Sequence, residues 1–201
     1  MRTFITKETL QASGVGAFFR PRDIKPLGVS FRQLQNLVSK GVVENLGSGL
    51  YRLSQVEPTE LETIAMVASV VPNAIVCLLT ALRISEIGTQ SPHEVWIALD
   101  RKSRKPTRLP AKVHIVRFSG AMLTYGVIRR PMLGIPVPIT SPARTVVDCF
   151  RYRNKVGIDV AMEALRDAVR SHKATVDEIS RAAEVRRART VMKTYLEALS
   201  Q

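Results

Sequence analysis

The sequence predicts an α+β protein with two domains, and three observations lead to that fold class. Residues 1–54 show three short helical patterns followed by two β-like runs, which is the element order of a winged helix-turn-helix. Between residues 94 and 139, apolar and polar residues alternate repeatedly, as they do in strands. After residue 158, apolar residues recur at helical spacing. Residues 55–201 are therefore predicted to form a mixed α/β domain with a small sheet and a helical C-terminus.

The first helices of the N-terminal domain are bounded by capping and breaking residues. Thr6 is a suitable N-cap for a helix that ends at Gly14. Pro21 suits the first turn of a second helix, and Pro26 should end that helix early. Ser30 caps a third helix, whose apolar residues at helical spacing are predicted to form one stripe. The residues of this stripe are Phe31, Leu34, Leu37 and Val38.

The third helix is followed by a hairpin and is predicted to read DNA. Residues 42–46 and 50–53 are typical of strands, and Gly47-Ser48-Gly49 tolerates the positive φ of a tight turn. Arg, Gln and Asn on the outer side of the helix can pair with base edges, while Ser and Lys suit phosphates. Residues 24–43 contain no acid; the alternative interpretation is the ordinary polar side of a soluble helix. The predicted DNA-contacting residues are Ser30, Arg32, Gln33, Gln35, Asn36, Ser39 and Lys40 on the helix, with Asn45 and Arg52 on the hairpin.

The positive charge of the chain lies in bands. The formal net charge is +13 and the pI is near 10.4, which favours an anionic partner, nucleic acid before a membrane surface. Residues 101–155 hold 13 Lys or Arg against 1 acid, whereas residues 55–100 hold 1 against 6. The densest cluster is expected in a loop between two strands, where it either contacts phosphates or forms a solvated turn. Its basic residues are Arg101, Lys102, Arg104, Lys105 and Arg108.

The second domain is predicted to alternate between helices and strands before its helical end. Residues 61–71 and 74–84 have the length and composition of helices, and Ser141-Pro142 is typical of a helix start. Thr175 and Glu178 have the spacing of a capping box. Further helices are expected from the apolar spacing over residues 158–169 and 191–199, and strands over residues 94–99, 112–118, 126–130 and 135–139.

Two groups of charged residues in this domain are predicted to form ion pairs. Arg144 and Asp148 stand four residues apart on one helix, which most often indicates a structural pair. Three arginines are expected to open the last helix, where the helix dipole disfavours cations. An acidic partner such as Glu178 or Glu184 would explain their position. These arginines are Arg186, Arg187 and Arg189.

The sequence offers no pattern for catalysis or for a cofactor. A nucleotidyltransferase needs an Asp-x-Asp pair about ten residues after a Gly-Ser, and none follows Gly47-Ser48. A metal nuclease needs clustered carboxylates, but the basic segment contains only Asp148. The His residues lack metal-binding spacing, and Cys77 and Cys149 are expected to be buried reduced thiols. We therefore expect no enzymatic activity, no metal and no cofactor.

Neither a secretion signal nor a membrane span is predicted. The N-terminal sequence MRTFITKE has no apolar segment of the kind that signal peptides require. The apolar run over residues 67–84 is interrupted by polar residues and is a poor membrane span. We expect a cytoplasmic protein with no membrane partner.

Several stretches together resemble a known family. The segment GVSFRQLQNLVSKGVVENLGSGLYRL, residues 28–53, resembles the winged helix of AbiEi-like antitoxins, from bacterial abortive-infection toxin–antitoxin systems of the type IV group. The segment GIPVPITSPARTVVDCF, residues 134–150, is similar to a strand and helix start of that family. Between them, ALRISEIG and EVWIALDRKSRKP stand where the family has a helix and then a strand with a basic turn.

The resemblance implies a specific biological role. It implies a DNA-binding antitoxin that represses its own promoter by binding inverted repeats in double-stranded DNA. It also implies that residues 55–201 counter a nucleotidyltransferase toxin, with which a stable complex is not required. Composition and periodicity by themselves support only DNA binding. Two alternatives stay open from the residues: a winged-helix regulator whose second domain senses a ligand or a protein, and an RNA-binding or nuclease module that uses residues 101–155.

Overall fold

The chain folds into two compact units, as a computed structural model shows. The structure describes residues 7–47, 49–54, 61–107 and 109–197. The first unit takes in the described residues of the ranges 1–72, 106–110 and 130–137, and the second unit takes in the remainder. Each unit has a hydrophobic core of its own. The division of function at residue 54 stays a prediction.

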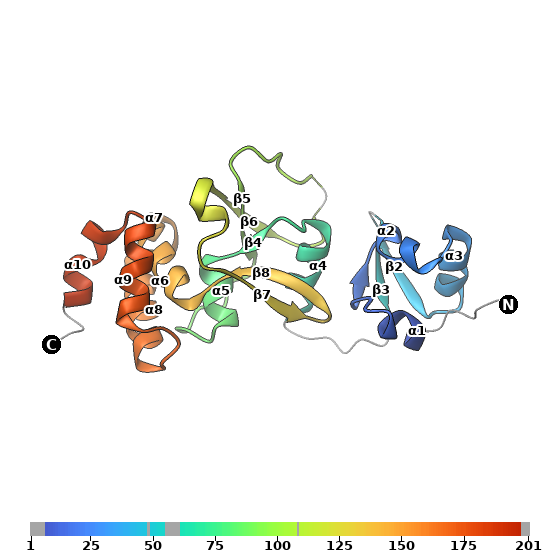
Figure 1. Ribbon diagram of the computed structural model, residues 1–201, viewed down its shortest axis with the longest axis horizontal. Coiled ribbons are helices and arrows are strands. Elements are labelled where there is room, and N and C mark those ends of the chain that lie inside the picture. Colours follow the sequence, from blue (N-terminus) through green and yellow to red (C-terminus); the bar gives the residue numbers. More distant parts are fainter. Residues whose placement is uncertain (1–6, 48, 55–60, 108, 198–201) are drawn as a thin grey trace. The chain divides into compact units, whose positions relative to one another are not determined.

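The first unit has the element order of a winged helix-turn-helix (Figure 1). Its strands form an antiparallel sheet in the order β1-β3-β2, with Phe18 opposite Arg52 and Val43 opposite Leu53. The elements are α1 (Lys7–Ala12), β1 (Phe18–Phe19), α2 (Pro21–Ile24), the 3-10 turn η1 (Lys25–Leu27), α3 (Phe31–Ser39), β2 (Val43–Gly47), β3 (Leu50–Leu53) and α4 (Glu62–Val70).

The core of this unit joins the helices to the sheet. Leu10 of α1, Leu34 of α3 and Leu53 of β3 are buried in one cluster, and α4 packs against β1. The tip of a later hairpin, residues 130–137, belongs to the same unit. The backbone N–H of Ala17 donates to the carbonyl oxygen of Leu133 at 2.8 Å, which fixes this tip beside β1.

Local signals in the N-terminal sequence place its turns correctly. Pro26 ends the α-helical hydrogen bonding of α2 at Ile24, as expected, and the chain then tightens into the 3-10 turn η1. Gly47 and Gly49 have φ values of +82° and +71°, which confirms the positive φ of the hairpin turn. Thr6 and Ser48 lie outside the described residues.

The predicted apolar stripe of α3 is wrong at Phe31. Leu34 and Leu37 are buried, but 65% of Phe31 is exposed. At about 100° per residue, Phe31 lies roughly 90° around the helix from the midpoint of Leu34 and Leu37. The buried side of the helix is therefore narrower than the apolar residues suggest, and Phe31 lies beyond its edge.

The second unit is built on a mixed sheet with helices after it (Figure 1). The strand order is β6-β5-β4-β8-β7. Strand β5 runs antiparallel to β4 and parallel to β6, and β4 runs parallel to β8. The strands are β4 (Ile75–Val76), β5 (Val95–Asp100), β6 (Val113–Phe118), β7 (Val127–Met132) and β8 (Ile135–Thr140). The strand predictions, and with them the α+β fold class, are confirmed.

The helices of this unit gather around α6, which packs against α5, α8 and α9. Helix α6 begins at Pro142 after the N-cap Ser141, as predicted, and the whole run from Arg144 to Phe150 is buried. The predicted capping box is also present: the Thr175 N–H donates to Glu178 Oε2 at 2.9 Å. The helical elements are α5 (Leu78–Ile84), the 3-10 turn η2 (Gly120–Leu123), α6 (Pro142–Arg151), α7 (Arg153–Val156), α8 (Ile158–Arg170), α9 (Val176–Val185) and α10 (Arg189–Glu197).

The helix predicted over residues 74–84 is partly wrong. Ile75 and Val76 form strand β4, and the helix begins only at Leu78, after the N-cap Cys77. A short apolar run has no period that separates a buried strand from a buried helix. The pairing of Ile75 and Val76 with residues of β5 decides between them here.

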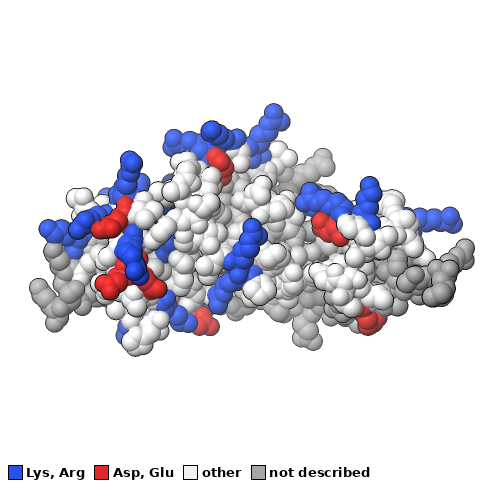
Figure 2. Space-filling view, viewed as in Figure 1, with Lys and Arg blue, Asp and Glu red and all other residues white. Residues whose placement is uncertain are grey.

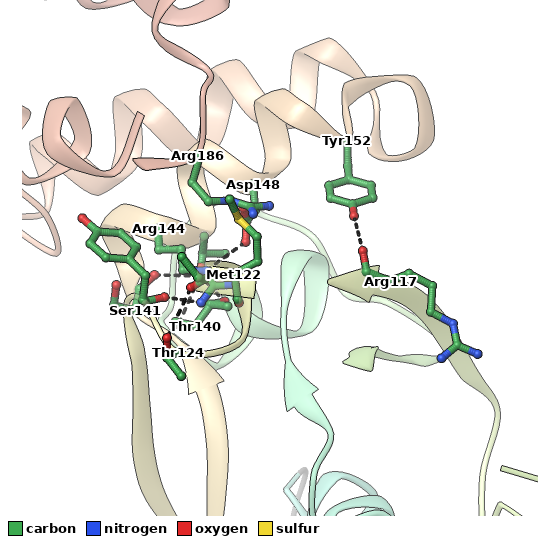
Figure 3. Close-up of polar contacts among 12 residues, drawn as sticks. Arg117, Met122, Thr124, Thr140, Ser141, Arg144, Asp148, Tyr152 and Arg186 are labelled. Carbon is green, nitrogen blue, oxygen red and sulfur yellow. Dashed lines mark hydrogen bonds and ion pairs between the residues drawn. The ribbon is translucent and has the colours of Figure 1, made fainter. Parts of the chain in front are cut away.

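A buried ion network ties α6 to the C-terminal helices (Figure 3). The Asp148 carboxylate accepts hydrogen bonds from Nε of Arg144, at 3.3 Å, and from Nε of Arg186. Arg144 also donates to two backbone carbonyls, and both guanidiniums lie over the Phe118 ring, 4.9 and 5.1 Å from its centroid. Burial raises the pKa of Asp148, and the two guanidiniums oppose that rise. The predicted ion pair of Arg144 and Asp148 is confirmed.

The expectation for the three C-terminal arginines needs correction. Arg186 is the C-cap of α9, so only Arg189 lies at the start of α10. The partner of Arg186 is Asp148, 38 positions away, instead of a neighbouring glutamate. Arg189 does pair with Glu184, at 3.2 Å. Proximity in sequence suggested Glu178 or Glu184 as the acidic partner, but the packing of α9 on α6 brings Arg186 to the buried carboxylate.

Two further features concern the membrane and the thiols. No helix in the described ranges is sufficiently long and apolar to span a bilayer. Cys77 and Cys149 are both free and buried, as expected for reduced thiols in a core. Burial raises the pKa of both thiols.

Candidate nucleic-acid interface

The start of α3 is fixed by reciprocal hydrogen bonds. The Ser30 N–H donates to Gln33 Oε1 at 2.8 Å, and the Gln33 N–H donates to Ser30 Oγ at 3.3 Å, which together form a capping box. Val29 before the cap and Leu34 in the first turn are both buried in the core of the unit. These contacts set the direction of the helix and therefore of its exposed side. Ser30 and Gln33 serve the helix start, and their predicted DNA contacts stay untested.

The side of α3 opposite its buried leucines is exposed and carries no carboxylate. Because Leu34 and Leu37 pack into the core, the polar residues on the opposite side of the helix face outward. Five of the predicted DNA-contacting residues lie on this side, which we call the α3 outer face: Arg32, Gln35, Asn36, Ser39 and Lys40.

Several contacts limit the freedom of the α3 outer face. Gln35 Nε2 donates to the Tyr51 hydroxyl at 3.4 Å, which links the helix to β3. Ser39 Oγ donates to the Asn36 carbonyl oxygen at 2.9 Å. The hydrogen bond to Tyr51 therefore restricts the orientation of the Gln35 side chain. Sequence reasoning missed this role of Tyr51. The signal for Tyr51 was weak, because one Tyr in a strand is usually a core residue.

The two hairpin residues have partners within the protein. Asn45 is exposed, and its Oδ1 accepts from the Gly47 N–H at 2.9 Å, which shapes the turn. Arg52 donates to Glu44, with Nε at 3.1 Å, and to Glu62 of α4. These acidic partners raise the pKa of Arg52, so it stays charged, but its guanidinium is largely neutralised. A DNA contact by Arg52 would have to compete with both carboxylates.

The basic loop after β5 begins with an ordered turn. Asp100 Oδ1 accepts from the Lys102 N–H, and the Asp100 carbonyl oxygen accepts from Ser103 N–H. Arg117 donates to the carbonyl oxygens of Asp100 and Ser103 at 2.8 Å each. Arg108 lies outside the described residues. The other predicted residues of the loop are all exposed: Arg101, Lys102, Arg104 and Lys105.

Lys and Arg side chains predominate over Asp and Glu on the face shown in Figure 2. This surface charge and the α3 outer face are the features that suit a polyanion. In the described part of the chain, no group of three or more His, Cys, Asp or Glu side chains is arranged to hold a metal ion.

A small pocket in the second unit lies at the N-terminal end of α6. Its volume is about 280 Å³, and Ser141, Lys173, Glu178 and Arg181 contribute its polar lining. Lys173 also pairs with Glu86 at 2.9 Å. The pocket is smaller than most sites for drug-sized ligands and is mixed in charge.

Comparison with known proteins supports the N-terminal assignment. Residues 10–54 match the family described as transcriptional regulator, AbiEi antitoxin. The fold is also similar to the crystal structure of the RV2827C protein from Mycobacterium tuberculosis, with a TM-score of 0.51 and 16% sequence identity. That similarity covers 90% of this chain and 66% of the other, slightly less than two thirds of its length, and it concerns the fold alone. No curated protein matches the chain. Residues 10–54, which hold α2, α3 and the hairpin, are thus similar to the AbiEi antitoxin family of transcriptional regulators, which confirms the resemblance for this segment alone.

Proposed function

We propose that this protein is a DNA-binding repressor of its own promoter and an antitoxin. The observation that carries the DNA-binding part is the α3 outer face, which is exposed, free of carboxylates and held in place by buried leucines and a capping box. The family match over residues 10–54 supports a regulatory role for the same segment.

The chemistry of the α3 outer face suits the major groove. Arg32 is able to make paired hydrogen bonds to guanine, and Gln35 and Asn36 are able to make them to adenine. Lys40, at the end of the helix, carries a point charge that suits a phosphate. The sequence preference therefore comes from the first turns of α3, and the general affinity comes from its basic residues. Inverted repeats in double-stranded DNA are the proposed binding sites.

The test compares single substitutions on two DNA duplexes. The protein is titrated by fluorescence anisotropy against its own upstream promoter fragment and against a shuffled duplex of equal composition, at two ionic strengths. Asn36→Ala should reduce the preference for the promoter by about 1–3 kcal/mol, because it removes the hydrogen bonds to one base. Lys40→Ala should weaken binding to both duplexes equally and lower the salt slope by about 1. Arg170→Ala removes an exposed charge of the second unit and serves as the control.

The outcomes separate specific reading from general charge attraction. If Asn36→Ala weakens binding to both duplexes alike, α3 is not the reading element. If Arg170→Ala has the same effect as Lys40→Ala, binding depends only on net charge. If the protein shows no preference for its promoter over the shuffled duplex, autorepression is refuted.

The basic loop has a separate test. We replace its four described basic residues with serine and measure the salt dependence of promoter binding. If the loop neutralises phosphates, the slope of log K against log salt falls by about 0.9 for each phosphate that the variant no longer neutralises. An unchanged slope would make the loop a solvated turn. The four residues are Arg101, Lys102, Arg104 and Lys105.

The antitoxin part rests on the family description and on the resemblance in sequence. In this proposal, the second unit counters a nucleotidyltransferase toxin encoded by a neighbouring gene, without a required stable complex. Co-expression of the chain with that gene product should restore growth. Asn36→Ala should lose part of its preference for the promoter and retain growth rescue, because in this proposal DNA reading and neutralisation use different units. Failure of the wild-type chain to restore growth would refute the antitoxin role.

One observation favours a second candidate function. The pocket at the start of α6 is lined by Ser141 and Arg181, whose side chains suit a small polar ligand, as in a regulator whose second domain senses a metabolite. A neighbouring metabolic enzyme gene, in place of a nucleotidyltransferase gene, would favour this alternative. A change in promoter affinity on adding that enzyme's substrate would support it directly.

A further inference from the structure

An aromatic side chain lies exposed at the start of α3. Among the large hydrophobic side chains that the structure describes as exposed, Phe31 has the largest exposed fraction, 65%, followed by Ile128 at 42% and Leu27 at 41%. Phe31 is the first residue of α3. The first turn of a helix usually favours an acidic residue because of the helix dipole, but that of α3 contains none. The sequence has an apolar ring here instead.

The exposure of Phe31 follows from the way the helix start is fastened. Val29 and Leu34 flank the capping box and are buried, 6% and 0% exposed, so they form the apolar staple of this helix start. The capping hydrogen bonds between Ser30 and Gln33 fix the backbone on either side of Phe31. Phe31 is therefore held outside the core on an anchored turn, and the core of the unit is complete without it.

We propose that the Phe31 ring packs against the C5-methyl group of a thymine in the major groove. This inference rests on the proposed function and names the base that the helix start reads. The thymine methyl is the apolar group that base edges present in the major groove, and an aromatic ring has no hydrogen bond to offer a phosphate or a polar edge. The N-terminal residues of a recognition helix are those that approach base edges.

The neighbouring residues place that thymine relative to another base pair. Gln35 stands four positions after Phe31, so the two side chains lie on adjacent turns of the same side of α3. Gln35 carries the amide that suits adenine, and Phe31 contacts a thymine in an adjacent base pair. Arg32 stands beside Phe31, and α3 contains no acidic residue. The surroundings of the ring are therefore positively charged, which suits DNA better than a second apolar protein surface.

The expected effect is small per methyl group and measurable. Burial of one methylene-sized apolar group changes an equilibrium constant by about fourfold. Replacing every thymine of the promoter fragment by uracil removes the C5-methyl groups and keeps the hydrogen-bonding edges. Wild-type protein should therefore bind uracil-containing DNA at least about fourfold more weakly per half-site than thymine-containing DNA.

The experiment crosses the base change with a change of the side chain. The full chain and its Phe31→Ala, Phe31→Leu and Leu27→Ala variants are titrated against promoter fragments amplified with thymidine or with deoxyuridine triphosphate. Phe31→Ala should bind both fragments equally, about as weakly as wild type binds the uracil fragment. Phe31→Leu should keep most of the discrimination. Leu27→Ala removes an exposed apolar side chain outside α3 and should discriminate as wild type does. Unchanged circular dichroism spectra verify that each variant is folded.

The outcomes distinguish this inference from the function on which it rests. If wild type shows no promoter preference on thymine DNA, the proposed function fails first. If wild type prefers its promoter but Phe31→Ala keeps the same ratio between thymine and uracil DNA, the assignment of Phe31 is overturned. A change of sedimentation coefficient in Phe31→Ala, with the ratio unchanged, would instead assign the ring to contact between protein molecules and would equally overturn it.

Discussion

Replacing Asp148 with Asn tests whether the buried ion network stabilises the second unit. Asn has nearly the shape of Asp without its charge, so the substitution keeps the packing and removes the carboxylate between Arg144 and Arg186. Both arginine side chains are 3% exposed or less, so water cannot replace the missing partner. Removing one partner of a buried ion pair costs about 3–5 kcal/mol. We expect a loss of free energy of unfolding in that range.

Urea unfolding at neutral pH, followed by circular dichroism, measures this loss. With a denaturant slope of about 1–3 kcal/mol per molar urea, the unfolding midpoint should fall by roughly 1–5 M. Glu184→Ala is the control, because its 3.2 Å pair with Arg189 is exposed and such pairs contribute about 1 kcal/mol or less. The reasoning is refuted if Asp148→Asn lowers the midpoint no more than Glu184→Ala does. Arg144 would then be compensated by its carbonyl contacts, and both arginines by the Phe118 ring.

Three further predictions concern capping, pH and the thiols. Ser30→Ala removes the hydroxyl that caps α3, so thermal unfolding of the first unit should show a loss of about 1 kcal/mol; an unchanged melting temperature would contradict this. The Thr175 N–H bond holds the pKa of Glu178 below its ordinary value of 4.5. The stability that this carboxylate contributes is therefore present above pH 4.5 and is lost as the pH falls through the lower pKa of the folded state. The urea midpoints of the wild type and of Glu178→Ala should thus converge at low pH. A difference between the two midpoints that stays constant with pH would argue against the lowered pKa. Burial raises the pKa of Cys77 and Cys149, so an aromatic disulfide reagent should react with them far more slowly in native than in urea-unfolded protein; equal rates would refute their inaccessibility.

Residues that act over a few positions could be interpreted from the sequence. Ser30 and Thr175 each begin a helix where the sequence predicts one, because a cap satisfies N–H groups only two or three residues away. Ser141 also precedes a predicted helix, where Pro142 suits the first helical position. Pro26 ends α2 because the missing N–H and the ring act on the preceding turn. The longer strands of the second sheet were also predicted near their observed positions, although β5 is buried at five consecutive residues and does not follow a period of two.

Residues whose role depends on a distant partner could not be assigned in this way. The apolar spacing placed Phe31 in the core, but the buried side of α3 is only as wide as the surface that Leu34 and Leu37 cover. Arg52 was predicted to reach DNA, and no local rule reveals that Glu62 of the following helix binds its guanidinium. Arg144 could be paired with Asp148 from the sequence because the two residues stand four positions apart on one helix. Arg186 could not, because it is 38 positions from Asp148.

The sequence by itself determined the order of most helices and of the longer strands, the start of several helices, the basic character of the chain and the acid-free stretch that includes α3. Tertiary structure alone decided which side of α3 faces outward, that residues 75–76 form a strand, and that Arg186 shares Asp148 with Arg144. The physical reason is the range of the interactions: capping and periodicity act within a few residues of the chain. Burial and ion pairing depend on side chains that packing brings together from distant positions.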